Sequence, residues 1–294
     1  MVRGMMRWIL NHKVIVIFVL LCLSYGGFLY ARDHKDTSDH YVNSLYQSDE
    51  RIYHNFLGED DQLMYDLILD SSIKHKTSMV IDMDQYHCVD YSDCGDIINY
   101  ASEAIYVDHP ELMNYAGYSW HYSHNKFVLN LHPSYRLSYK DYYGVWRIEN
   151  YLSQIEKATQ NMNDQEKIIY VYDWIGKHSD YDYYFTYTSK NQSIYNVFVK
   201  KNAVCAGFAK ASQIIFSRIG IESYIVNGES EDYHMWNIVK YNDHYYYYDS
   251  TIAVGYQTKS PHYYDGLRQE SMNHYQSFHD DWYPSVEVTN MFEI

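Results

Sequence analysis

Apolar residues recur at helical spacing in five stretches of the chain, and short alternating runs stand between them. The helical stretches lie at 61–73, 96–112, 148–155, 164–182 and 205–219. Asn163 precedes the fourth stretch and Glu166 follows three residues later, a spacing typical of a capping box. Alternation predicts strands at 77–83 and 221–228, and a hairpin at 118–135. The pattern therefore indicates an α+β protein.

A second hairpin is expected at residues 234–251. Its two-residue turn is Asn242–Asp243, because both residue types tolerate left-handed backbone angles. Tyr241 then pairs with His244, and this one pair sets the register of all the others.

In this register His234 faces Thr251 and Trp236 faces Asp249 on one face of the sheet. His234 and Asp249 are then diagonal neighbours, roughly 7–8 Å apart by backbone and closer by side chain. We expect the carboxylate to hold the imidazole while the other ring nitrogen points off the sheet. Trp236 is expected to shield this pair from water.

Cys205 begins the last predicted helix, and Gly220 ends it where a left-handed C-cap is expected. A thiol in the first turn lies at the positive end of the helix dipole, which favours the thiolate. Gly207 and the alanine before it would leave room for a substrate backbone. If this helix end lies over the hairpin, Cys205, His234 and Asp249 form a nucleophile, a base and an orienting acid. A structural cysteine at a helix start would show the same local pattern.

Four motifs resemble the bacterial transglutaminase-like superfamily: AVCAGFAKA, GIESYIVNG, HMWNIV and YYDST. The resemblance covers about residues 145–255, and the upstream DHPEL is similar to a segment of many exported members. It implies that Cys205 is the nucleophile, His234 the base and Asp249 the orienting acid. It also implies a papain-like α+β core, in which a Cys-bearing helix packs on an antiparallel sheet. The supporting positions of these motifs are Gly207, Trp236 and Asn237.

The chain departs from the family pattern at two places. Tyr246 stands where a tryptophan is usual, and Asn242–Asp243 replaces the glycine of the hairpin turn. Neither change removes a catalytic atom. The Cys205 amide is one expected oxyanion donor, and Trp174 and Tyr181 are candidates for the side-chain donor.

The N-terminus carries Arg3, Arg7 and Lys13 before an uncharged apolar run at residues 14–31. This run is just long enough to span a bilayer. The positive excess on its N-terminal side places the rest of the chain outside the cell. We expect an uncleaved, single-pass signal anchor. Cleavage after Ala31, which would release a secreted protein, is the alternative.

Cysteine usage fits an exported protein. Cys22 lies in the membrane segment, and Cys88 and Cys94 are close enough in sequence to form a disulfide outside the cell. Cys205 is left without a partner, which is typical of a reactive thiol. No second cysteine pair completes a zinc site, so we expect neither a metal nor another cofactor.

Composition excludes one class of partner. The formal net charge is -15 and no basic stripe is present, whereas binding to nucleic acid needs clustered Lys and Arg. The 37 tyrosines suit either half-buried sheet positions or a surface that binds glycans or peptides.

The expected organisation is a signal anchor at 1–31, an α+β region at 32–138 and a transglutaminase-like domain at 139–294. The resemblance implies thiol-dependent acyl transfer on protein or peptide amides, at the membrane and in contact with cell-wall material. Crosslinking, deamidation and proteolysis all stay open, because the acyl acceptor is not visible in the sequence. The alternative is a non-catalytic transglutaminase-like binding module at the cell surface.

Overall fold

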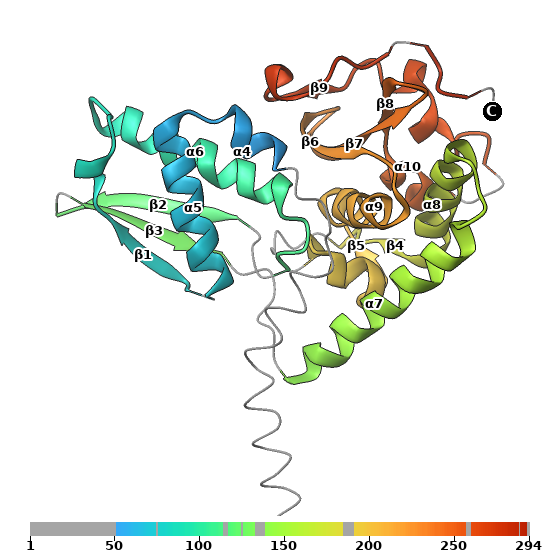
Figure 1. Ribbon diagram of the computed structural model, residues 1–294, viewed down its shortest axis with the longest axis horizontal. Helices are drawn as coiled ribbons and strands as arrows, with labels where there is room; N and C mark the ends of the chain where they lie inside the picture. The colour runs from blue at the N-terminus through green and yellow to red at the C-terminus, as the bar shows by residue number, and fades with distance from the viewer. Residues whose placement is uncertain are drawn as a thin grey trace, which may run out of the picture. The chain divides into compact units, whose positions relative to one another are not determined.

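The computed structural model describes residues 51–74, 76–113, 117–124, 126–132, 139–184, 191–256, 260–287 and 289–292 (Figure 1). All of them belong to one compact unit. Within these ranges no helix is both long and apolar enough to cross a membrane. The membrane segment expected at 14–31 lies outside the described residues.

The first part of the described chain is a three-stranded antiparallel sheet with helices against it (Figure 1). The strand order is β1-β3-β2. Phe127, Leu129 and Leu131 alternate on β3 and are buried, so one face of the sheet packs against the helices. The elements are α4 (Ile52–Phe56), α5 (Glu59–Ile73), β1 (Ser78–Ile81), η1 (Met83–Gln85), α6 (Tyr91–Asp108), β2 (Tyr118–Ser123) and β3 (Lys126–Leu131).

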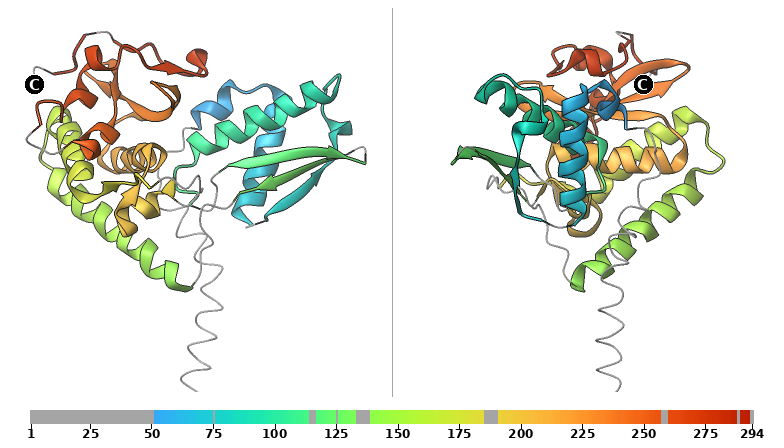
Figure 2. Two further views of the ribbon diagram at one scale, coloured as in Figure 1. Left: turned by 180° about the vertical axis from the view of Figure 1, so that it is seen from behind. Right: turned by 60° about the vertical axis from the view of Figure 1, so that its left-hand side comes forward.

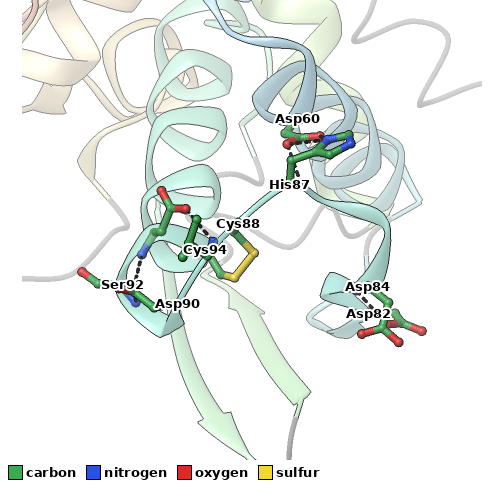
Figure 3. The surroundings of a disulfide bond; sticks show 10 residues. Asp60, Asp82, Asp84, His87, Cys88, Asp90, Ser92 and Cys94 are labelled. Carbon is green, nitrogen blue, oxygen red and sulfur yellow. Dashed lines mark hydrogen bonds and ion pairs between the residues drawn. A yellow bond between two sulfur atoms is a disulfide. The ribbon is translucent and has the colours of Figure 1, made fainter.

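A disulfide between Cys88 and Cys94 ties the loop before α6 to the first turn of that helix (Figure 3). The Asp90 side chain caps the same helix end. It accepts hydrogen bonds from the backbone N–H groups of Ser92 at 2.9 Å and Asp93 at 3.0 Å. The start of α6 is thus held by a covalent bond and by an N-cap.

The second part is built around α9 (Cys205–Ile219), which packs on a four-stranded antiparallel sheet of order β8-β7-β6-β9. Figure 2 shows this gold helix between the orange strands and the green helices α7 and α8. The other elements are α7 (Tyr139–Thr159), α8 (Asp164–His178), β4 (Asp180–Tyr181), η3 (Asn196–Lys200), β5 (Asn202–Ala203), β6 (Ser223–Glu229), β7 (Tyr233–Tyr241), β8 (His244–Tyr248), α10 (Ser250–Gly255), η4 (Asp265–Leu267), η5 (Gln269–Ser271), β9 (Gln276–Ser277) and η6 (Asp280–Trp282).

Local signals in the sequence predicted several of these features correctly. The capping box at the start of α8 is present, with both reciprocal bonds between Asn163 and Glu166. Gly220 ends α9 at φ 76°, in the left-handed region. Asn242 and Asp243 have φ values of 50° and 63°, and the turn they form pairs Tyr241 with His244 as expected.

Two expected strand pairs are wrong, those of His234 with Thr251 and of Trp236 with Asp249. Strand β8 ends at Tyr248, opposite Asn237. The Asp249 side chain accepts a hydrogen bond from the N–H of Thr251 and so caps α10 instead of extending the strand. In α5, Leu63 is 55% exposed, and Met64, Tyr65, Ile68 and Leu69 supply the buried apolar stripe.

One cluster of buried side chains runs from α5 and α6 to strands β6 and β7. The hydroxyl of Tyr53 on α4 donates to the backbone oxygen of Ile225 on β6. The first part therefore covers apolar surface of the second sheet. The domain boundary expected at 138/139 falls within one compact unit and stays a prediction.

Candidate active site

Cys205 is the first residue of α9 and lines a cleft of about 930 Å³ together with His234. It is half-buried, and it is the free cysteine of the described chain. Val204 caps the helix through its backbone alone. Because the first N–H groups of a helix lack intrahelical acceptors, backbone donors lie next to this thiol.

His234 and Asp249 form a hydrogen-bonded ion pair beside this cysteine. Nε2 of His234 lies 2.7 Å from Oδ2 of Asp249, and the two side chains are 14% and 2% exposed. Cys205 lies close enough to His234 to contribute to the raised pKa of the imidazole. Since Nε2 is bound to the carboxylate, Nδ1 is the nitrogen left to face the thiol. The structure thus brings the three predicted site residues together. It does so without the expected pairing of Trp236 with Asp249, from which their proximity was predicted.

The Asp249 carboxylate is held by two further donors. The N–H of Thr251 lies 2.8 Å from Oδ1, and the Tyr275 hydroxyl lies 2.8 Å from Oδ2. The backbone N–H of Asp249 donates to the oxygen of Gly266 at 2.9 Å. A Cβ atom on Gly266 would lie 2.1 Å from the Asp249 backbone oxygen, so only glycine permits this approach. These contacts hold the Asp249 carboxylate in one position and give both of its oxygens a hydrogen-bond donor.

The pair is ionised at neutral pH. Burial lowers the pKa of His234, but the Asp249 charge, the hydrogen bond to Asp249 and the nearby Cys205 outweigh it and raise the pKa to about 10. Burial raises the pKa of Asp249, but the His234 charge and the hydrogen bonds from His234, Tyr275 and Thr251 outweigh it and lower the pKa.

Tyr275 is a site residue that the sequence reasoning missed. It is buried, and its ring lies 5.6 Å from that of His234 and 4.9 Å from that of Trp236 between centroids. It follows Asp249 by 26 residues, in a segment without helical or alternating periodicity. No local pattern in the sequence could have indicated this contact.

The three supporting residues have distinct structural roles. Trp236 is buried and stacks on His234, with centroids 6.0 Å apart, so it covers one face of the imidazole; its role in excluding water stays a prediction. Nδ2 of Asn237 donates to the backbone oxygen of Ala209 at 3.1 Å and thereby ties β7 to α9.

Gly207 does not make room for a substrate, contrary to expectation. It is absent from the cleft lining, and a Cβ there would lie 2.9 Å from Cβ of Ala203 and 3.2 Å from the backbone oxygen of Asn191. The space that it leaves is filled by the protein's own chain, which approaches α9 closely at this point.

The two oxyanion candidates lie in different places. Tyr181 lines the cleft, and its strand pairs it with Ala203, two residues before Cys205. Burial and the nearby negative charges, that of Cys205 first, raise the pKa of Tyr181 to about 12, so its hydroxyl is a hydrogen-bond donor at neutral pH. Trp174 is outside the cleft lining and stacks on His178 of its own helix, with centroids 4.1 Å apart.

No group of three or more metal-ligating side chains occurs in the part of the chain that the structure describes. The histidine-rich stretch at 121–124 lies on β2 and the adjoining turn.

Comparison with known proteins identifies one family. The model of the transglutaminase-like superfamily matches residues 150–250, a range that includes Cys205, His234 and Asp249 but not Tyr275. No curated protein gives a significant match to the sequence.

Solved structures show weaker similarity. A TGase is 15% identical, with a TM-score of 0.36, over 49% of this chain and 45% of that one. A candidate cysteine protease from Cytophaga hutchinsonii is 13% identical, with a TM-score of 0.32, over 46% and 61%. The periplasmic domain of TgpA from Pseudomonas aeruginosa is 14% identical, with a TM-score of 0.29, over 44% and 56%. The chain spans less than two thirds of each of these structures. On the family match, residues 150–250 are a transglutaminase-like domain.

Proposed function

We propose that the protein is a thiol-dependent enzyme that transfers acyl groups from amides of proteins or peptides. The observation that carries the proposal is one chain of contacts in one cleft. Cys205 at the N-terminus of α9 lines the same cleft as His234, whose Nε2 lies 2.7 Å from the buried Asp249 carboxylate. Nucleophile, base and orienting acid in this order are the arrangement that acyl transfer through a thioester needs.

In the first step the Cys205 sulfur attacks the carbonyl carbon of the substrate amide. The negative charge moves to the carbonyl oxygen, for which we propose the Cys205 backbone N–H and the Tyr181 hydroxyl as hydrogen-bond donors, because both residues line the cleft. The imidazolium of His234 then donates its proton to the departing nitrogen as the carbon–nitrogen bond breaks. Ammonia or an amine leaves, and a thioester on Cys205 remains.

In the second step His234 accepts a proton from the incoming acceptor, which attacks the thioester and releases the thiolate. Water as the acceptor gives deamidation or proteolysis, and a lysine amine gives a crosslink. Asp249 stays ionised throughout and keeps Nδ1 of His234 directed at the sulfur. The product depends on which acyl acceptor enters the cleft. The same three residues act in each case.

A thiol probe tests this proposal directly. Purified protein should be labelled at Cys205 by an activity-based thiol reagent and should release ammonia or amine from peptide substrates. Cys205→Ala should abolish both, and His234→Ala should abolish turnover. If labelled protein shows no turnover on any glutaminyl or peptide amide, while peptides still bind to the cleft, the domain is a non-catalytic binding module.

We further propose that residues 14–31 anchor the protein in the cell membrane with the domain outside, near cell-wall material. The charge asymmetry around this segment supports that orientation, and the Cys88–Cys94 disulfide suits an oxidising compartment. Protease added to intact cells should degrade the domain. Protection from protease would contradict the orientation, and a shortened N-terminus in the mature protein would indicate secretion after cleavage.

A further inference from the structure

The wall of the cleft next to the catalytic base is acidic. Glu231 and Asp232 lie in the turn between β6 and β7, and they precede His234 by three and two residues. Both residues line the same cleft as His234, and the turn that carries them leads directly into the strand of this base. Both residues are exposed, and neither forms a salt bridge with another described residue. Their charge is therefore available to a ligand.

Glu103 on α6 brings a third carboxylate to the same cleft from the first part of the fold. Its Oε2 lies at hydrogen-bonding distance, 2.9 Å, from Nε2 of His279. Among the described residues that line the cleft, no lysine or arginine is present. The His234 cation is already balanced by Asp249. The field in the cleft is consequently negative, which attracts cations and repels acidic substrates.

A buried acceptor points to the same kind of ligand. Asn227 on β6 lines the cleft and is only 7% exposed, and its Oδ1 has no hydrogen-bond partner in the described structure. A buried carbonyl oxygen without a donor is costly, so such a group is expected to receive one from water or a ligand. Since Oδ1 can only accept, its partner must carry N–H or O–H.

The remaining walls suit an aliphatic stem. Four tyrosines line the cleft: Tyr106, Tyr118, Tyr181 and Tyr233. One face of the Tyr106 ring already holds the buried Lys210, whose Nζ lies 3.4 Å from the ring centroid, so the rings of the other three are the ones open to a ligand. Aromatic faces pack against the methylene groups of long cationic side chains and attract their charged ends. A calcium ion has no methylene groups that could pack on these rings.

We propose that this part of the cleft is a subsite for a protonated side chain, of the lysine or arginine type, on the peptide whose amide Cys205 attacks. The cationic end lies between Glu231, Asp232 and Glu103, it donates a hydrogen bond to Asn227, and its stem packs on the tyrosine rings. The inference rests on the proposed function where it predicts a preference in turnover. The predicted preference in peptide binding can be measured without any catalysis. The subsite binds the peptide that supplies the acyl group. The cationic side chain of that peptide takes no part in the reaction and keeps its charge.

The test uses the full chain in detergent with Cys205→Ala, so that binding is measured without turnover. Two otherwise identical peptides carry arginine or its neutral isostere citrulline beside a glutamine. We expect tighter binding of the arginine peptide, by about two- to fivefold for each carboxylate, and a weaker preference in 0.5 M NaCl. The double variant Glu231→Gln, Asp232→Asn should lose most of this preference. Asp243→Asn at the exposed turn at the other end of β7 is the matched control and should retain it.

Equal binding of the two peptides, or a preference that survives the double variant, would overturn the subsite. So would calcium binding that the double variant abolishes, because the carboxylates would then serve a metal. With Cys205 intact, kcat/KM should show the same preference, mainly through KM. Absence of turnover together with preserved arginine preference would refute the catalytic proposal and leave the subsite in place.

Discussion

Tyr275 donates its hydroxyl hydrogen to Oδ2 of Asp249, the same carboxylate oxygen that His234 contacts. The two distances are 2.8 and 2.7 Å. Tyr275 lies beyond the part of the chain that matches the family model, so the segment after the matched domain completes the support of the ion pair.

Tyr275→Phe should weaken the site without removing a reacting atom. Loss of a hydrogen bond to a buried carboxylate costs about 1.5–3 kcal/mol, so we expect a lower melting temperature and roughly tenfold slower turnover. The pKa of Asp249 should rise, which moves the acid limb of the pH–rate profile to higher pH. Tyr184→Phe, at a highly exposed tyrosine, is the control. An unchanged acid limb in Tyr275→Phe would remove this residue from the site.

Labelling of Cys205 should depend on His234 more than on Asp249. His234→Ala removes the neighbouring imidazolium and should slow alkylation by iodoacetamide near pH 7 by about 10²-fold. Asp249→Asn should retain part of the rate, because Asp249 acts only through His234. Cys205→Ser should fold normally, as judged by circular dichroism, and form no acyl intermediate. Equal labelling rates in the wild type and His234→Ala would show that Cys205 is an ordinary core thiol.

The His234–Asp249 pair should make stability fall with rising pH. The pKa of His234 is raised from 6.5 to about 10 on folding, so its contribution is complete below pH 6.5 and is lost as pH rises through 10. We expect the free energy of unfolding in urea to fall by about 2–4 kcal/mol between pH 6.5 and 10. In His234→Gln this decline should largely disappear. A wild-type curve that runs parallel to that of the variant would contradict the ionised pair.

Gly207→Ala should destabilise the protein and disturb the position of Cys205. The added Cβ meets Ala203 at 2.9 Å, so the chain before α9 must shift, at about 1–3 kcal/mol. Thermal unfolding and the rate of Cys205 labelling should both report the shift. Gly255→Ala is the control, since the nearest atom to its Cβ is 3.9 Å away. Identical melting curves for the two variants would mean that the packing at Gly207 is loose.

Removal of the Cys88–Cys94 disulfide should loosen the start of α6. Replacement of both cysteines by serine should cost about 2 kcal/mol, because the bond closes only a short loop. Turnover of an uncharged substrate should change little, since the disulfide lines no part of the catalytic cleft. Alkylation without reductant should label neither cysteine, and equal labelling of both would show that the bond does not form.

The sequence by itself determined the features that depend on neighbouring residues. The helix periodicity, the Asn163 capping box, the Asn242–Asp243 turn and the Tyr241–His244 pair all arise from contacts a few residues apart. The motifs around Cys205, His234 and Asp249 predicted that these three residues belong to one site, and in the structure His234 contacts Asp249 and lines a cleft with Cys205.

Only the tertiary structure decided how these groups are held. Asp249 leaves the strand because its side chain caps α10 locally and Gly266 admits its backbone oxygen from a distant segment. Tyr275 reaches the Asp249 carboxylate from 26 residues further along the chain. Glu103 reaches the cleft from about a hundred residues before Cys205. Such contacts depend on loop closure and on the packing of separate layers, and neither leaves a periodic signal in the sequence.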